Sequence, residues 1–200
     1  MASRPTTART RKAKKGGAGA LLLTPGAGAS RTHHTLVAIE ERVAPLPTAR
    51  VDFPYRIAGK RAPDKAPVAI AHLVDEAAAL VADAGVAADR LVLGGRSYGG
   101  RMCSMAVAEG LPAAGLVLLS YPLHPPGKPD NLRVEHFGSI EVPVLFVSGA
   151  KDPFGSPAEF DEHVAAIAGP VTQVWLTGGH DPRNQDDVIA DTVAEWLAGL

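Results

Sequence analysis

Six short runs rich in apolar residues recur after Gly17, and segments with helical spacing separate them. Most of the runs are continuous rather than alternating, which is typical of parallel strands covered on both faces. Alternation of strands and helices therefore predicts an α/β fold with a mostly parallel sheet of about six to seven strands and helices on both faces. The predicted strands are 20–25 (ALLLTP), 50–55 (RVDFPY), 90–95 (RLVLGG), 115–122 (GLVLLSYP), 143–149 (PVLFVSG) and 172–178 (TQVWLTG).

Two of the intervening segments carry clear helix signals. Ser156 followed by Pro157 and Glu159 is the pattern of a capping box, and it predicts a helix that ends before Gly169. The segment 68–84 ends at a glycine, and one face of it carries apolar residues at helical spacing: Ile70, Val74, Ala77 and Val81. The long irregular segment 121–141 is expected to be a functional loop.

Length and composition fit one globular domain. The chain has 200 residues, of which 46% are hydrophobic and 20% charged. The single cysteine, Cys103, excludes an internal disulfide and a cysteine-based zinc site, so we expect a reducing, cytoplasmic location. No apolar run approaches the ~20 residues that a membrane span needs.

Charge is distributed unevenly along the chain. The net charge is −1, but six of the 20 basic residues and no acidic residue lie within residues 1–15. We expect residues 1–17 to form a disordered basic tail and residues 18–200 to form a single domain. The rest of the chain is acidic and would repel phosphate, so no nucleic-acid partner is expected for the domain.

A lone serine between glycines follows the third predicted strand. Residues 95–99 (GRSYG) match the pattern G-x-S-x-G and lie between a predicted strand and a predicted helix, which is the context of a nucleophile elbow. Such a turn projects the hydroxyl of Ser97 above the sheet edge. The backbone N–H of Tyr98 then faces a developing oxyanion. We expect Ser97 to be a nucleophile.

A serine nucleophile needs a base, and the base needs an orienting acid. In this topology the acid and the histidine follow the serine along the chain, each at a later strand end. Asp152 follows the run 143–149, and His180 follows the run 172–178. Asp181 is a rival acid, although adjacent residues seldom point their side chains at one another. The predicted triad is Ser97, Asp152 and His180.

The loop after the first predicted strand is glycine-rich and is expected to supply the second oxyanion donor, the N–H of Ala27. Gly26 and Gly28, with Asp52 further along, also imitate a dinucleotide fingerprint. That pattern fails because position 31 is arginine instead of glycine, and it leaves the serine and the histidine unexplained. No cofactor is expected. No set of His, Asp or Glu residues shows metal-ligand spacing, so no metal is expected either.

Taken together, these motifs resemble the α/β-hydrolase superfamily, specifically its small dienelactone-hydrolase-like members without a large cap domain. The resemblance covers about residues 20–200. It implies the triad and the oxyanion donors named above, and it implies that Tyr55 and the loop YPLHPPGKP border the pocket. The segments that carry it are TPGAGAS, FPYR, GGRSYGGRM, SYPLHPPGKP, VPVLFVSGAKDP and GGHDP.

Two side chains near these motifs are weaker pocket candidates. His124 lies in the loop after a strand end and is expected to point into the pocket. Arg96, beside the serine, is a candidate contact for an anionic substrate group, with a solvated surface position as the alternative.

Two positions depart from the family pattern. Pro25 stands where the superfamily usually has a histidine, and Ser97 stands where dienelactone hydrolase itself uses a cysteine. The sequence thus predicts a serine hydrolase that acts on a small-molecule ester or related acyl substrate through an acyl-enzyme. The alternative is a non-catalytic, hydrolase-like binding or scaffold module, and Pro25 motivates it.

Overall fold

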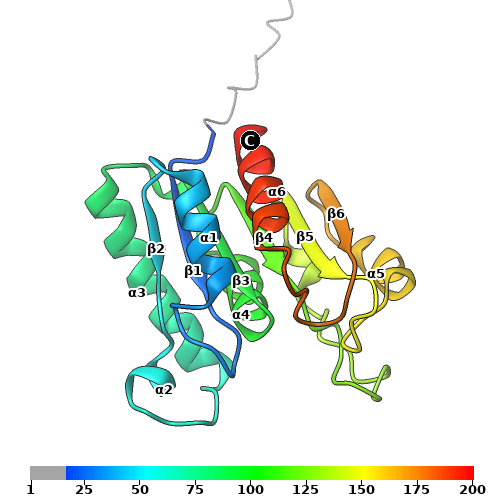
Figure 1. The fold of residues 1–200 in the computed structure, drawn as a ribbon. Helices are drawn as coiled ribbons and strands as arrows, with labels where there is room; N and C mark the ends of the chain where they lie inside the picture. Colours follow the sequence, from blue (N-terminus) through cyan, green and yellow to red (C-terminus); the bar gives the residue numbers. More distant parts are fainter. Residues whose placement is uncertain (1–16) are drawn as a thin grey trace, which may run out of the picture.

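A computed structural model describes residues 17–200, and its centre is one parallel sheet of six strands (Figure 1). The strand order β2-β1-β3-β4-β5-β6 confirms the predicted α/β architecture. The basic segment 1–17 lies outside the described residues except for Gly17, so the expected disordered tail stays a prediction. The strands are β1 (Ala20–Thr24), β2 (Thr48–Arg50), β3 (Leu91–Arg96), β4 (Gly115–Leu119), β5 (Val144–Gly149) and β6 (Val171–Leu176).

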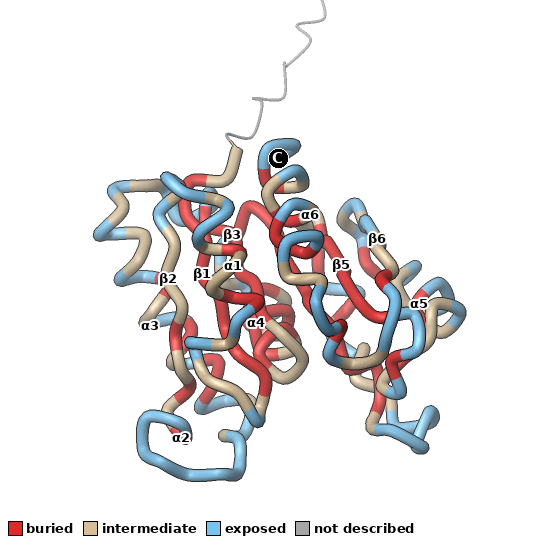
Figure 2. Tube along the Cα trace, viewed as in Figure 1, coloured by how far each residue is buried: buried red, intermediate tan, exposed pale blue. Residues whose placement is uncertain are grey.

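Helices cover both faces of the sheet because the side chains of its central strands alternate between two apolar cores. Leu22 of β1 belongs to the core under three helices, whereas Leu21 and Leu23 belong to the core under two others. The four central strands are consequently buried, the edge strands β2 and β6 are only partly buried, and the outer helix faces are exposed (Figure 2). The first face is covered by α3 (Ala66–Ala84), α4 (Tyr98–Ala108) and α5 (Pro157–Val164), and the second by α1 (His34–Val43) and α6 (Asp186–Ala198).

The strand register brings the carboxyl ends of the strands to one edge of the sheet. Thr24, the last residue of β1, pairs with Gly95 of β3, and Gly149 at the end of β5 pairs with Leu176 at the end of β6. From β1 the chain crosses to the edge strand β2 and then returns to β3 on the other side of β1. The loops after β1 and β3 therefore diverge at a switch point, where ligands bind in folds of this type.

Helix α5 begins as the sequence predicts. The Ser156 Oγ accepts from the Glu159 N–H at 3.4 Å, and the Glu159 carboxylate accepts from the Ser156 N–H at 2.8 Å, which completes the capping box. The helix ends at Val164, ahead of the expected end near Gly169. Among residues 17–200, no helix combines the length and the apolar character that crossing a membrane requires.

Two local predictions are wrong. The predicted strand 50–55 is only the short β2, which ends at Arg50, and residues 54–57 form the helical turn α2 (Pro54–Ile57). Proline cannot donate to a strand ladder but fits the first turn of a helix, so Pro54 overrides the strand-like composition. Val74 of α3, expected on the buried face, is 43% exposed, and its neighbour Leu73 is buried instead.

Candidate active site

Ser97 occupies a strained turn between β3 and α4. Its backbone has φ 51° and ψ −116°, a left-handed conformation that is uncommon for a residue with a side chain. The flanking glycines are required by close packing: a Cβ on Gly95 would lie 2.6 Å from the Gly100 nitrogen, and one on Gly100 would lie 2.7 Å from the Gly95 oxygen. The turn therefore has the geometry of a nucleophile elbow.

The structure brings Ser97, His180 and Asp152 together from three remote segments. The Ser97 Oγ lies 2.9 Å from His180 Nε2, and His180 Nδ1 lies 2.8 Å from Asp152 Oδ2. The Asp152 side chain is only 1% exposed, and its other oxygen accepts from the Phe154 N–H at 2.9 Å. With Nδ1–H donating to the carboxylate, the neutral imidazole presents Nε2 as an acceptor to the serine hydroxyl.

The histidine loop is held in place from two sides. Phe154 lies against the imidazole with a ring-centroid separation of 4.1 Å. Arg96 donates through Nη2 to the His180 carbonyl and to Asp181 Oδ1, both at 2.7 Å. Arg96 thus braces the backbone of the loop instead of lining the cavity beside Ser97. Asp181, the rival acid, is occupied by this ion pair.

The two predicted oxyanion donors, the backbone N–H groups of Ala27 and Tyr98, belong to residues beside Ser97. The residues Ala27 and Tyr98 line the same cavity as Ser97, and within residues 17–200 neither N–H donates to a backbone oxygen. The Tyr55 hydroxyl donates to the Ala27 carbonyl at 2.8 Å, which anchors the loop at the peptide that follows the Ala27 N–H. Burial raises the pKa of Tyr55, so the hydroxyl stays a donor. Tyr55 therefore braces the loop that Pro25 begins, although it does not line the cavity itself.

The cavity beside Ser97 has a volume of about 290 Å³ and combines apolar and cationic side chains. His124, expected to point into it, is not among its lining residues. It is buried, with Nδ1 2.9 Å from the Pro125 oxygen and Nε2 3.1 Å from Glu159 Oε1, and so it joins the 121–141 loop to α5. The cavity is lined by Ala27, Pro63, Ser97, Tyr98, Arg101, Pro122, Arg133 and Phe154.

Four of these lining residues were missed by the sequence analysis, namely Pro63, Arg101, Arg133 and Phe154. Arg101 lies in the segment GGRSYGGRM, one helical turn after the serine, and this spacing could have indicated it. Arg133 lies in the long loop that was expected to be functional. The resemblance placed only residues 121–129 of that loop at the pocket, and no sequence signal singles out Arg133.

One cluster has the residue types of a metal site. Ligand atoms of His33, His34 and Asp181 lie within 4.8 Å of one another. Each group already has a protein partner: His33 Nδ1 accepts from the Thr35 N–H, His34 Nδ1 lies 2.7 Å from Asp186 Oδ2, and Asp181 binds Arg96. We assign no metal to this cluster, and the expectation of no metal stays a prediction.

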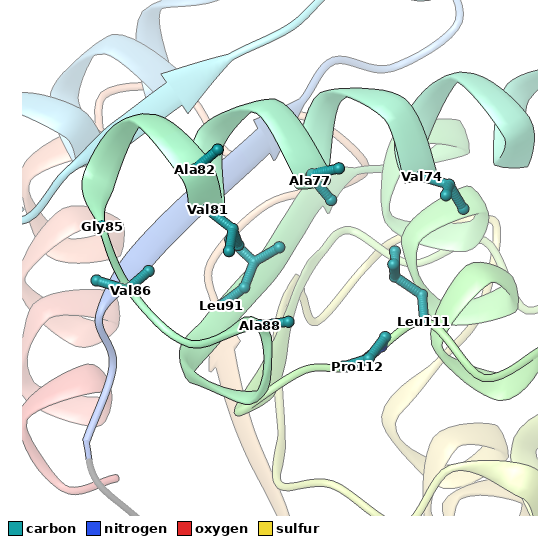
Figure 3. Close-up of a pocket in the computed structure, with 11 residues that line it drawn as sticks. Val74, Ala77, Val81, Ala82, Gly85, Val86, Ala88, Leu91, Leu111 and Pro112 are labelled. Atoms are coloured by element: carbon teal, nitrogen blue, oxygen red, sulfur yellow. The ribbon is translucent and has the colours of Figure 1, made fainter.

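A second and larger cavity lies at the opposite end of β3 (Figure 3). Its volume is about 480 Å³, and α3, the start of β3 and the turn after α4 enclose it. Every lining residue is apolar or glycine, so this cavity offers no group for chemistry. The lining residues are Val74, Ala77, Ala78, Val81, Ala82, Gly85, Val86, Ala88, Leu91, Leu111 and Pro112.

A parallel sheet with a serine at a strained strand-to-helix turn, above the carboxyl ends of the strands, is the architecture of an α/β hydrolase. A family model described as an alpha/beta hydrolase domain matches residues 17–195. The chain belongs to this family, and its enzyme class is hydrolase.

Solved structures agree with this assignment. The dienelactone hydrolase from Anabaena variabilis is 20% identical with a TM-score of 0.73, and the match covers 92% of this chain and 87% of that chain. A Bacillus cereus carboxylesterase is 16% identical with a TM-score of 0.65, covering 91% and 88%. The type II thioesterase BorB from the borrelidin biosynthetic cluster is 19% identical with a TM-score of 0.64, covering 90% and 93%. These similarities show a shared fold, and they confirm the resemblance to small members of the superfamily without a large cap domain.

Proposed function

We propose that this protein is a serine hydrolase that cleaves a small ester or a related acyl compound through an acyl-enzyme intermediate. The observation that carries the proposal is the unbroken chain of hydrogen bonds from Ser97 through His180 to Asp152, with distances of 2.9 Å and 2.8 Å. Ser97, at the start of this chain, lines a cavity that a substrate carbonyl can enter.

The acylation step uses all three side chains. His180 Nε2 takes the proton of the Ser97 hydroxyl while the oxygen forms a bond to the substrate carbonyl carbon. The imidazolium that forms is stabilised by the buried Asp152 carboxylate on Nδ1. His180 then gives the proton to the leaving group as the bond between the carbonyl carbon and the leaving group breaks, which leaves the acyl group on Ser97.

Deacylation repeats the same proton transfers with water. Water attacks the acyl carbon, His180 accepts its proton, and the Ser97 oxygen leaves and is reprotonated. In both tetrahedral intermediates the negative oxygen lies where the N–H groups of Ala27 and Tyr98 converge. Loss of one such donor costs about 3–4 kcal/mol of transition-state stabilisation in comparable sites. The Tyr55 hydroxyl bond to the Ala27 carbonyl matters for this reason.

The site favours small substrates. Its volume of about 290 Å³ lies at the lower end of the range for ligand pockets, roughly 300–1,000 Å³. The structural neighbours include an esterase, a thioesterase and a dienelactone hydrolase, and their names are consistent with acyl compounds as substrates.

A cytoplasmic location is part of the proposal. Cys103, the only cysteine, is fully buried, and burial raises the pKa of its thiol to about 12. The Cys103 thiol lies against Thr24 and is not accessible for a disulfide. Because the raised pKa keeps the thiol protonated, it cannot act as a nucleophile. The serine is thus the nucleophile that the chain offers at this site.

Hydrolysis of short p-nitrophenyl esters tests the proposal. The native protein is expected to release p-nitrophenol with saturation kinetics, and Ser97→Ala is expected to lose at least about a thousandfold in kcat. Circular dichroism and thermal unfolding of the variant control for its fold. Equal rates for native protein and variant would overturn the proposal, and inactivity of both on all esters would favour the binding-module alternative.

A further inference from the structure

Two arginines in the cavity beside Ser97 have no acidic partner. Arg101 and Arg133 both line this cavity, and within residues 17–200 neither side chain forms an ion pair or a hydrogen bond to another protein group. The Nε atom of Arg101 is buried without a hydrogen-bond partner. By contrast, Arg31, Arg42, Arg50 and Arg96 each pair with a carboxylate.

The surroundings of these arginines leave their charges uncompensated. Burial, followed by the charge of Arg101, lowers the pKa of Arg133. The same two causes, in the same order, lower the pKa of the neighbouring His136 to about 4, so this histidine is neutral near pH 7. Glu135 is the one carboxylate whose charge acts on both Arg133 and His136, but it is exposed to solvent and forms no ion pair with Arg133.

An unpaired, partly buried cation is costly, so a site that holds two of them is built for an anion. Guanidinium groups match the planar geometry of a carboxylate and bind it through paired hydrogen bonds. Arg101 lies one helical turn beyond the nucleophile, and its backbone N–H donates to the Ser97 carbonyl at 3.0 Å. An anion bound by Arg101 in this cavity would lie beside the carbonyl that Ser97 attacks.

We propose that Arg101 and Arg133 form a carboxylate-binding subsite, and that the substrates of this protein are esters or related acyl compounds that carry a carboxylate close to the scissile carbonyl. This inference rests on the proposed function and specifies its substrate class. Arg96, the arginine that the sequence suggested for an anionic group, is excluded from the role because it is engaged by the His180 loop.

The supporting elements hold the subsite in place. The Tyr121 hydroxyl donates to the Arg133 carbonyl at 2.7 Å, and the Arg133 N–H donates to the Leu123 carbonyl at 2.8 Å. These contacts fasten the 121–141 loop over the cavity through backbone groups. They leave the Arg133 guanidinium free to meet a ligand.

A matched pair of substrates tests the inference. Mono-p-nitrophenyl glutarate and its methyl ester have the same acyl chain, with the distal carboxylate free in one and masked in the other. We expect kcat/KM, divided by the rate of hydroxide hydrolysis of each ester, to favour the anionic ester roughly ten- to a hundredfold. A second pair, butyryl esters of 4-hydroxybenzoate and of its methyl ester, places the carboxylate on the leaving group. Preference for the anion in neither pair would overturn the inference.

Variants assign the preference to the two arginines. The ratio of interest is the normalised kcat/KM of the anionic ester divided by that of its neutral partner, for the preferred pair. Arg101→Met and Arg133→Met are each expected to reduce this ratio at least about tenfold. Arg90→Met makes the same charge change at the far end of β3 and is expected to keep the native ratio. A native ratio in Arg133→Met, or the same loss in Arg90→Met, would contradict the assignment.

A binding measurement separates this inference from the proposed function. In Ser97→Ala protein, monomethyl glutarate is expected to shift amide resonances of the cavity residues at concentrations where dimethyl glutarate does not. Should the native protein hydrolyse no ester, this binding preference decides the inference alone. Selective binding would support the carboxylate subsite while the hydrolase proposal fails, and equal binding of the two compounds would overturn the subsite.

Discussion

The two cavities at opposite ends of β3 differ in size and in chemistry. The larger cavity lacks reactive side chains, and the smaller cavity contains them. The cavity at the amino end is the larger, at about 480 Å³, but its lining is entirely apolar. The cavity at the carboxyl end measures about 290 Å³ and holds the strained Ser97 and two unpaired arginines. The proposed function rests on the side chains that line the smaller cavity, whereas cavity volume alone would have favoured the opposite end of β3.

The physical origins of the two cavities differ as well. At the amino end, small side chains on α3 (Ala77, Ala78 and Ala82) leave space above Leu91. At the carboxyl end, loops diverge at the switch point between β1 and β3, so the space is a consequence of topology. Of the two cavities, only the one at the carboxyl end has a strained backbone and unpaired cationic side chains beside it, and backbone strain clusters at functional sites.

The largest expected effect is that of Asp152→Asn. An amide cannot stabilise the imidazolium or hold the required tautomer, so kcat for ester hydrolysis is expected to fall roughly 10³- to 10⁴-fold. Steady-state kinetics with a p-nitrophenyl ester measures this. The matched control is Asp181→Asn, which breaks only the ion pair with Arg96 and is expected to cost less than about tenfold. A larger loss in the control than in Asp152→Asn would make Asp181 the acid.

A smaller effect is expected from Tyr55→Phe. This substitution keeps the buried ring but removes the hydroxyl that anchors the loop at the Ala27 carbonyl. Because the Ala27 N–H next to this carbonyl is the proposed oxyanion donor, kcat is expected to fall roughly tenfold with little change in KM. Tyr98→Phe removes a hydroxyl that binds the Asp64 carbonyl instead, and a smaller loss is expected. Should KM rise while kcat stays constant, Tyr55 would be a ground-state contact and not a brace for the oxyanion loop.

His136, a neighbour of the arginines that line the cavity beside Ser97, is expected to make the stability of the protein depend on pH. Burial, with the charge of Arg101 second, lowers the pKa of His136 from 6.5 in the unfolded chain to about 4. Between these values the unfolded chain binds the proton more tightly, so the contribution of neutral His136 to stability is complete above pH 6.5 and is lost as the pH falls towards 4. The free energy of unfolding, measured with urea, is expected to decrease between about pH 7.5 and about pH 4.5. This decrease is expected to be smaller for His136→Asn than for the native protein. Equal decreases would contradict the lowered pKa.

The smallest effect is expected at the apolar cavity. Ala82→Met adds an apolar side chain to its lining, far from Ser97. Ester hydrolysis is expected to stay within about twofold of the native rate, and the free energy of unfolding to change by less than about 0.5 kcal/mol in either direction. A tenfold loss of kcat/KM with unchanged stability would connect the larger cavity to catalysis. It would contradict the claim that only the cavity at the carboxyl end of β3 is functional.

The sequence predicted those parts of the molecule that local patterns and topology determine. Continuous apolar runs indicated the parallel sheet, and GRSYG between a strand and a helix indicated the elbow. The order of Ser97, Asp152 and His180 along the chain then brought three residues to one sheet edge. Each of these inferences needs only a local motif and the rule that parallel strands end on the same side.

Other features depend on tertiary packing that no local pattern describes. Arg133 meets Arg101 only because the 121–141 loop folds back over α4, and Tyr55 reaches Ala27 only because Pro54 turns a predicted strand into a helix. Arg96 and His124 were candidates for contacts with substrate, with a solvated surface position as the alternative for Arg96, but the partners that the fold supplies engage both side chains elsewhere. Side-chain direction was thus harder to predict than the position of a residue along the sheet.

The most direct test of the account is covalent labelling by a fluorophosphonate, followed by mass spectrometry of the intact protein and of its peptides. The native protein is expected to gain one adduct, on the peptide that contains Ser97, and Ser97→Ala protein is expected to gain none. Labelling of both proteins to the same extent, or an adduct on a different residue of the native protein, would contradict the assignment of Ser97 as the nucleophile.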